Sequence, residues 1–106
     1  MAEPTADELL LAAVRNYCDI TWADAATDTK TTGLIQRGKA YLDDIAGEAQ
    51  DYAVEGQARS LLFDYVRYFR SNAGEMFKVN YRDELTALRL AREVADYEDE
   101  TTDPEL

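Results

Sequence analysis

Carboxylates are the side chains in this sequence that could carry out acid–base chemistry, and most of the candidates are adjacent pairs. Asp43 and Asp44 form one pair, Asp83 and Glu84 form another, and Asp64 stands alone. Adjacent residues on a helix point about 100° apart, so the two acids of a pair do not converge as a general acid and a general base must. We therefore expect these acids to face solvent.

The other residue types that catalysis and metal binding need are missing or isolated. Histidine is absent, which removes the commonest general base and most transition-metal sites, and Cys18 is the single cysteine. We expect Cys18 to be half-buried at a helix end. Asp24 and Asp28 lack the spacing of a calcium loop, and no glycine-rich phosphate-binding motif occurs. We predict no catalytic residue, no metal site and no cofactor, and so a protein that is not an enzyme.

The acidic residues are unevenly distributed along the chain. The net charge is −11, from 22 acidic and 11 basic residues, and residues 96–106 contain six of the acids and no base. Proteins that bind nucleic acids neutralise phosphates with lysine and arginine, so we expect DNA to pass close by without specific binding. The acidic composition of the end of the chain predicts disorder. We divide the chain into a helical domain, 1–95, and a flexible acidic tail, 96–106.

The length of 106 residues suits one small domain. No run of about 18 apolar residues occurs, and the chain does not begin with basic residues followed by an apolar stretch. We therefore expect no membrane span and no signal peptide, and a protein that stays in the cytoplasm or in a particle assembled there.

Apolar residues recur at helical spacing along most of the chain, and no segment alternates as a strand would. The pattern predicts an all-α fold, a small bundle of about four helices. A capping box of Thr5 and Glu8 starts the first helix near Ala6, and Gly47 is the expected left-handed residue after the second. The expected helices span 6–18, 28–46, 57–72 and 80–95, with one further turn at 75–79. Gly38 indicates close approach of another backbone or is simply tolerated.

The segment 61–77 combines more aromatic and apolar surface with arginine than any other stretch. Helical spacing places four of its residues on one stripe, which we predict to be core: Leu62, Tyr65, Phe69 and Ala73. The next stripes carry Phe63, Val66, Arg70 and Tyr68. This surface exceeds what one small core needs, so we expect part of it to contact a partner.

The arginines of this segment allow two interpretations. Arg67 and Arg70 flank Tyr68 and Phe69, as in a platform that stacks single-stranded nucleic acid. The acidic background instead favours ion pairs with Asp64, with Glu75 or with a neighbouring subunit, and arginine and tyrosine are enriched at protein interfaces. We predict subunit contacts at Trp22, Arg67, Tyr68 and Arg70.

Three motifs in this order resemble the head–tail connector proteins of tailed bacteriophages, also called adaptor or head-completion proteins. The matching residues are Ile20, Thr21, Trp22, Asp24, Thr27 and Asp28; then Ile35, Gly38, Tyr41, Leu42, Ala46 and Gly47; then residues 61–64, Tyr65, Arg67, Tyr68, Arg70, Asn72, Ala73 and Phe77. The resemblance covers about residues 7–92. Two positions depart from it: Val66 stands where the motif has cysteine, and Gly74 where a larger apolar residue is expected.

The resemblance implies a helical, non-catalytic virion subunit at the head–tail junction. Such subunits form a ring, commonly of twelve copies, below the portal protein, extend the DNA channel and offer a docking surface to the next stopper or tail-completion protein. In this setting we predict that Asp83 and Glu84 line the channel. We predict that the acidic tail docks on the portal through Tyr97, Glu98, Asp99, Glu100 and Leu106.

Two other classes of function compete with this interpretation. An acidic DNA mimic encoded by a phage would inhibit a host DNA-binding enzyme with carboxylates placed like phosphates. It predicts acids on rigid helices, whereas more than half of the net charge here falls in the expected flexible tail. A small carboxylate-based enzyme would need metal-dependent turnover.

Overall fold

A computed structural model describes residues 3–101, with the main chain alone described for Asp96 and for 98–101. The described residues form five helices and no strand, so the predicted all-α class is confirmed. The helices are α1 (Ala6–Tyr17), α2 (Ala25–Ala46), α3 (Gln57–Arg70), α4 (Gly74–Asn80) and α5 (Arg82–Thr101). The count is one higher than expected because the turn at 75–79 is a separate short helix. No helix of the described part is long and apolar enough to cross a membrane.

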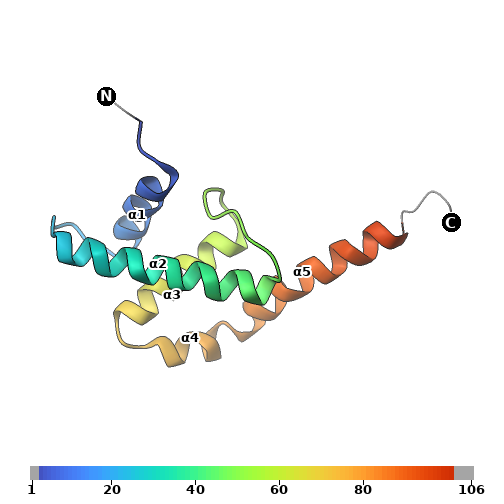
Figure 1. The fold of residues 1–106 in the computed structure, drawn as a ribbon. Helices are drawn as coiled ribbons and strands as arrows, with labels where there is room; N and C mark the ends of the chain where they lie inside the picture. Colours follow the sequence, from blue (N-terminus) through green and yellow to red (C-terminus); the bar gives the residue numbers. More distant parts are fainter. Residues whose placement is uncertain (1–2, 102–106) are drawn as a thin grey trace.

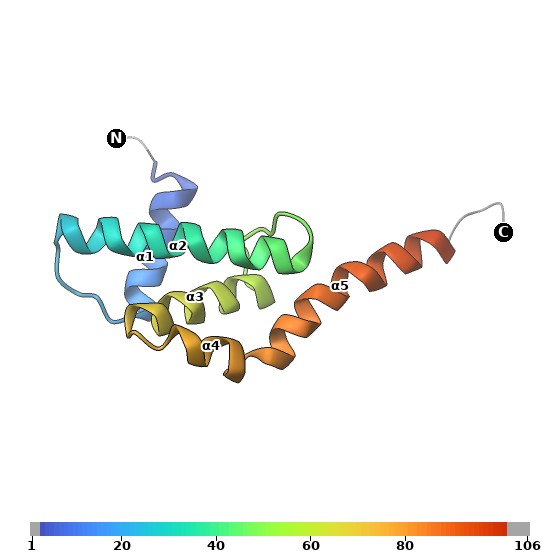
Figure 2. The same cartoon turned by 60° about the horizontal axis from the view of Figure 1, so that its bottom comes forward.

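The long helix α2 packs along α3, and the other helices are arranged around this pair (Figure 1). Helix α1 contacts both α2 and α3, and α4 covers the C-terminal part of α3. Helix α5 touches α2, α3 and α4 near its beginning and then leaves the body, as Figure 2 also shows. The radius of gyration is 16.4 Å, whereas a compact domain of this length has about 13 Å. The molecule is therefore a small body with one projecting helix.

The core lies between α2 and α3 and extends to α1, α4 and α5. Its buried members are Leu10, Val14, Leu34, Ile35, Leu42, Ala46, Tyr52, Leu61, Leu62, Tyr65, Val66, Phe77, Leu85 and Leu88. Leu62 and Tyr65 are core residues as predicted, whereas Phe69 and Ala73 are only half-buried. Val66, which the sequence placed on the surplus stripe, is fully buried. Helix α3 has two buried stripes because other helices pack on several of its sides.

Phe77 is the largest fully buried side chain, and it brings α2, α3 and α4 together. Its ring centre lies 5.5 Å from that of Tyr65 and 6.4 Å from that of Tyr41, both in edge-on geometry, and 5.0 Å from that of Tyr81. Aromatic pairs at such spacings add about 0.5–1.5 kcal/mol each beyond the area they bury. Much of the aromatic surplus of the sequence is therefore used inside the subunit.

Helix α2 begins three residues earlier than the sequence suggested, at Ala25. The Asp24 carboxylate accepts hydrogen bonds from the backbone N–H groups of Ala26 and Thr27, each at 3.3 Å, so Asp24 is the N-cap in place of the expected Thr27 or Asp28. Asp28 instead forms a 2.8 Å ion pair with Arg15 of α1. Gly47 ends the helix in the left-handed conformation, as predicted.

Helix α3 ends at Arg70, two residues before the predicted end. Asn72 has a φ of 58°, a left-handed conformation that a continuing helix does not allow. At Gly74 an added Cβ would lie 2.5 Å from Cε1 of Phe69, so the larger apolar residue expected there has no room. The chain therefore turns sharply between α3 and α4.

Helix α5 extends to Thr101, six residues beyond the boundary drawn at Ala95. The first residues of the segment expected to be a flexible tail are thus helical. Glutamate, a strong helix former, occurs twice in this extension, at positions 98 and 100. Residues 102–106 of the predicted tail lie outside the described residues.

Gly38 of α2 packs directly against side chains of α3. A Cβ built at this position would lie 2.7 Å from Cδ1 of Leu62 and 2.8 Å from Cδ1 of Tyr65, both in the core. Cβ atoms essentially never approach other atoms this closely. The close approach at Gly38 is therefore made by side chains of α3, and not by another backbone as the sequence suggested.

We predict that Gly38→Ala lowers the free energy of unfolding by about 1–3 kcal/mol, because the added methyl forces apart two well-packed helices. Gly33→Ala in the same helix is the matched control, since a Cβ there meets nothing within 4 Å. It should raise stability by up to about 1 kcal/mol. Urea unfolding of both variants measures the difference, and equal stabilities would contradict the interpretation.

Candidate functional site

The predicted contact residue Trp22 lies in the connection between α1 and α2 and is 47 % exposed. Its indole N–H donates to the Thr27 hydroxyl at 3.4 Å. The guanidinium carbon of Arg70 lies 5.6 Å from the centre of the indole ring, a cation–π contact that joins this connection to the end of α3. Trp22 and Arg70 therefore lie together at the surface, and each already has a partner within the subunit.

Arg67 belongs to a second group of polar side chains, built around Asp64. The Asp64 carboxylate accepts a 2.5 Å hydrogen bond from the Tyr17 hydroxyl and lies 3.4 Å from the Arg67 guanidinium. Arg67 in turn donates to the Tyr81 hydroxyl at 3.5 Å. The hydrogen bond to Asp64 raises the pKa of Tyr17. This group, which we call the Asp64 cluster, ties α1 and α3 to the turn before α5.

The fourth predicted contact residue, Tyr68, is half-buried. Its ring packs edge-on against Phe77 and Tyr81, and its hydroxyl accepts a 3.1 Å hydrogen bond from the Asn80 side chain. Most of the Tyr68 ring is thus used to hold α4 on α3. Of the four predicted contact residues, Trp22 and Arg67 expose the most surface.

The predicted channel residues Asp83 and Glu84 are exposed in the first turn of α5. Negative charge is favourable there because the N-terminal end of a helix carries a partial positive charge. The acids thus stabilise the start of α5 whatever else they do.

The part of α5 that projects from the body has an exposed apolar stripe, which sequence reasoning did not single out. Leu90, Val94 and Tyr97 are spaced by four and three residues and are 41 %, 53 % and 67 % exposed. We call residues 90–101 the α5 arm. The sequence does contain this pattern: the spacing of the three residues forms a second apolar stripe on α5, beside the one that carries the buried Leu85 and Leu88.

The predicted portal-docking residues lie at the end of the α5 arm. Tyr97 is exposed, and Glu98, Asp99 and Glu100 belong to the last turns of α5, where only the main chain is described. Leu106 lies outside the described residues. The structure therefore places four of the five on one projecting helix.

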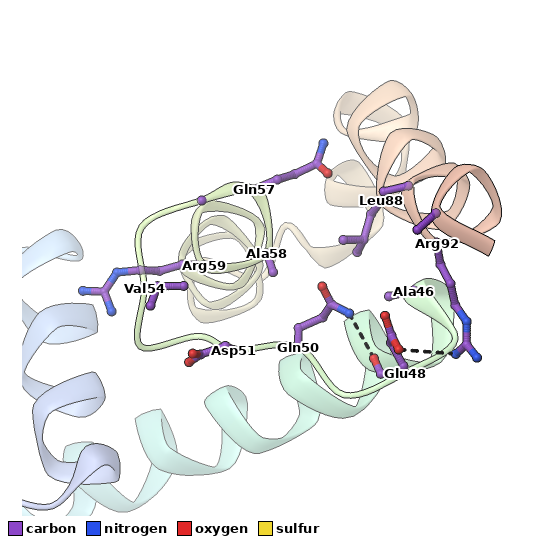
Figure 3. Close-up of a pocket in the computed structure, with 13 residues that line it drawn as sticks. Ala46, Glu48, Gln50, Asp51, Val54, Gln57, Ala58, Arg59, Leu88 and Arg92 are labelled. Carbon is purple, nitrogen blue, oxygen red and sulfur yellow. Dashed lines mark hydrogen bonds and ion pairs between the residues drawn. The ribbon is translucent and has the colours of Figure 1, made fainter. Parts of the chain in front are cut away.

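A cavity of about 400 Å³ lies at the root of the arm, between the end of α2, the 47–56 connection, α3 and α5 (Figure 3). Its walls are largely apolar, with Ala46, Ala58 and Leu88 facing one another across it. The Glu48 carboxylate pairs with Arg92 at 3.8 Å, and Arg92 also donates to the Gly47 carbonyl. Arg92 therefore holds the arm to the end of α2.

The connection that forms one wall of this cavity is fixed by Tyr52. This side chain is buried, and its hydroxyl donates to the Asp43 carboxylate at 2.7 Å. Asp43 also accepts from the Gln50 backbone N–H at 3.0 Å. Burial, with the Asp43 hydrogen bond adding to it, raises the pKa of Tyr52. One acid of the Asp43–Asp44 pair thus has a structural role.

Several carboxylates of the described residues are used for helix capping and internal pairing. Asp24 caps α2, and the Thr27 hydroxyl bond lowers the pKa of this carboxyl. Asp28 and Asp64 pair with arginines. Within residues 3–101, no group of three or more Asp, Glu, Cys or His side chains is placed to hold a metal ion. The Trp22–Arg70 region and the α5 arm are two exposed surfaces that remain available for contacts with other molecules.

Comparison of the chain with protein-family models, with curated proteins and with solved structures gave no match.

We predict that the Asp64 cluster makes stability fall as the pH rises from about 10 to 12. Burial, followed by the Asp64 carboxylate, raises the pKa of Tyr81 to about 12, whereas tyrosine in an unfolded chain ionises near pH 10. In the folded state Tyr81 keeps its proton to a higher pH than in the unfolded chain. The stabilisation that results is complete below pH 10 and is lost as the pH rises above it. Urea unfolding over this pH range measures the decline.

The variant Asp64→Asn should lower the pKa of Tyr81 and make the decline shallower, because it removes the negative charge that opposes ionisation. Tyr97→Phe is the control, since Tyr97 is exposed on the α5 arm and should leave the decline unchanged. An ultraviolet titration in which Asp64→Asn left all tyrosine transitions unchanged would contradict the assignment.

Proposed function

We propose that the protein is a head–tail connector subunit of a tailed bacteriophage. In this proposal about twelve copies form a ring below the portal protein, extend the DNA channel and present a docking surface to the next stopper or tail-completion protein. The protein acts in the virion, at the head–tail junction, after synthesis in the host cytoplasm. The proposal rests on the resemblance of residues 7–92 to connector proteins.

The single structural observation that supports the proposal is the α5 arm. A monomer that worked alone would be expected to bury Leu90 and Val94 against its own body, but both are exposed on a helix that leaves it (Figures 1 and 2). Exposed apolar surface of this kind is typical of protein–protein contact sites. A projecting helix gives a small subunit a long reach toward its neighbours.

The charge of the subunit suits a channel through which DNA must move. The net charge of −11 is repeated in every copy of a ring, and like charge keeps DNA from adhering to the wall. Asp83 and Glu84 are exposed and are the residues that we propose to line the channel. The function needs no cofactor and no catalysis.

We propose that the end of the arm, from Tyr97 to Leu106, docks on the portal. Tyr97 is the most exposed large apolar side chain among the described residues. Aromatic residues that are exposed in the free protein and bordered by charge are typical anchors of interfaces. The acidic residues that follow would then select a basic partner surface.

A DNA mimic that inhibits a host DNA-binding enzyme is the second candidate function, and one observation favours it. Helix α5 continues to Thr101, so Glu93, Asp96 and residues 98–100 are carried on a helix, where fixed spacing of negative charge is possible. Inhibition of a DNA-binding enzyme by the isolated monomer, with no binding to portal-bearing capsids, would select this function.

The test of the connector proposal is to mix the purified full chain with capsids that contain a portal and to image the mixture by negative-stain electron microscopy. We expect an annular density below the portal vertex and none on capsids that lack a portal. The proposal is contradicted if the chain binds neither kind of capsid at concentrations well above those of the capsids.

Truncation after Ala95 tests the docking role of the end of the arm. The truncated chain keeps every described core residue, so we expect the same thermal stability, and it should fail to join portal-bearing capsids. The point variant Leu9→Ala, which removes an exposed apolar side chain on α1, is the control and should join normally. Equal incorporation of the truncated and full chains would show that the portal is bound elsewhere.

A further inference from the structure

One face of the molecule is basic although the chain as a whole is acidic. Lys30, Arg37 and Tyr41 lie on the same side of α2, because their spacing of seven and four residues corresponds to whole turns. Lys78 of α4 joins this side, since its ammonium nitrogen lies 5.5 Å from the centre of the Tyr41 ring. Val79, next to Lys78, is 56 % exposed. We call these five residues the basic face.

The three bases of the basic face form no ion pair within the described subunit, and the exposed Asp44 is an acid on the same side of α2. Lys30, Arg37 and Lys78 are exposed, and none of the ion pairs formed among residues 3–101 includes them. An acidic segment approaching this protein is repelled by most of a surface whose net charge is −11. The basic face is where such a segment can approach favourably.

The α5 arm has the complementary properties. Residues 90–101 contain five acids and one base, Arg92, and Leu90 and Val94 add exposed apolar surface beside Glu93. The basic face offers the exposed Val79 and the half-buried Tyr41 as apolar counterparts. Charge and apolar contact can therefore be satisfied together if the arm lies on the basic face.

The two surfaces that match lie on different parts of the molecule. The arm points away from the body on one side (Figure 2), whereas the basic face lies along α2, from Lys30 to Tyr41, and on α4. Helix α5 is continuous from Arg82 to Thr101, so the arm cannot fold back onto the basic face of its own chain. The partner must be another molecule.

We propose that the α5 arm of one copy of this chain docks, through Leu90 and Val94, on the basic face of the next copy. This contact is heterologous, since it joins two different surfaces, and repeated heterologous contacts close into rings or extend into filaments. The inference deepens the proposed function, because it identifies the surfaces that would hold the connector ring together.

The test uses two variants that each lose one of the two surfaces. Val94→Glu places a charge in the apolar stripe of the arm, and Arg37→Glu reverses a charge of the basic face. Both residues are exposed, so circular dichroism and thermal unfolding should match the wild type. Sedimentation equilibrium should show concentration-dependent self-association of the wild type, weakened by about tenfold or more in each variant alone.

The decisive sample is the equimolar mixture of the two variants. Val94→Glu keeps an intact basic face and Arg37→Glu keeps an intact arm, so the mixture can form one correct contact per pair. We expect a heterodimer that grows no further. An arm-to-arm contact would instead leave Arg37→Glu fully self-associating, and that result would overturn the proposal.

Two matched variants control for charge and apolar surface away from the contact. Arg89→Glu makes the same change in charge as Arg37→Glu, and Leu9→Glu places a charge on an exposed apolar residue of α1, as Val94→Glu does on the arm. Both should associate within about twofold of the wild type. The proposal is also overturned if the wild type stays monomeric up to about 1 mM, where even weak contacts form.

The outcome can be separated from that of the connector proposal. If the variants and their mixture behave as expected but no chain joins portal-bearing capsids, the head-to-tail contact stands and the phage function fails. If rings form below the portal and both single variants join them normally, the function stands and the contact proposed here is wrong.

Discussion

The close approach of α2 and α3 at Gly38 is the constraint on which the rest of the structure depends. Because no side chain separates the helices there, Leu62 and Tyr65 reach the backbone of α2 and the two helices form one packed layer. Tyr65 can then meet Phe77, whose fully buried ring attaches α4. The position of α4 in turn sets where α5 begins.

The subunit uses its polar residues in two different ways. Inside the body, carboxylates are tied to specific partners: Asp43 to Tyr52, Asp64 to Tyr17 and Arg67, and Asp28 to Arg15. On the surface, exposed bases lie on one side of α2 and α4, and acids lie along the α5 arm. Charges paired inside the body hold the helices in place, whereas these exposed charges are available to another molecule. This division is why we assign structural roles to the first set and a contact role to the second.

Arg67 and Tyr68, which the sequence predicts as subunit contacts, also have partners inside the subunit. The sequence predicts both as subunit contacts because α3 has more aromatic surface than one helix face can bury. In the structure α3 is surrounded by α1, α2, α4 and α5, so more than one of its faces is covered. Tyr68 packs on Phe77, and Arg67 lies within the Asp64 cluster. The aromatic surface of α3 is in excess only if the helix buries a single face. Because several faces of α3 are covered, that assumption does not hold. Trp22 and Arg67 still expose enough surface to contact a neighbour.

Local sequence determined the helical class, the capping of α1 by Thr5 and the left-handed end of α2 at Gly47, because each depends on residues within one or two turns. The absence of histidine likewise limits the chemistry of the chain, however its helices pack. Tertiary structure alone decided that Val66 is buried and Val94 is not, although both are valines on amphipathic helices. Burial depends on whether another helix is present to cover a given face. For Val66 the chain provides that helix, and for Val94 the described chain provides none.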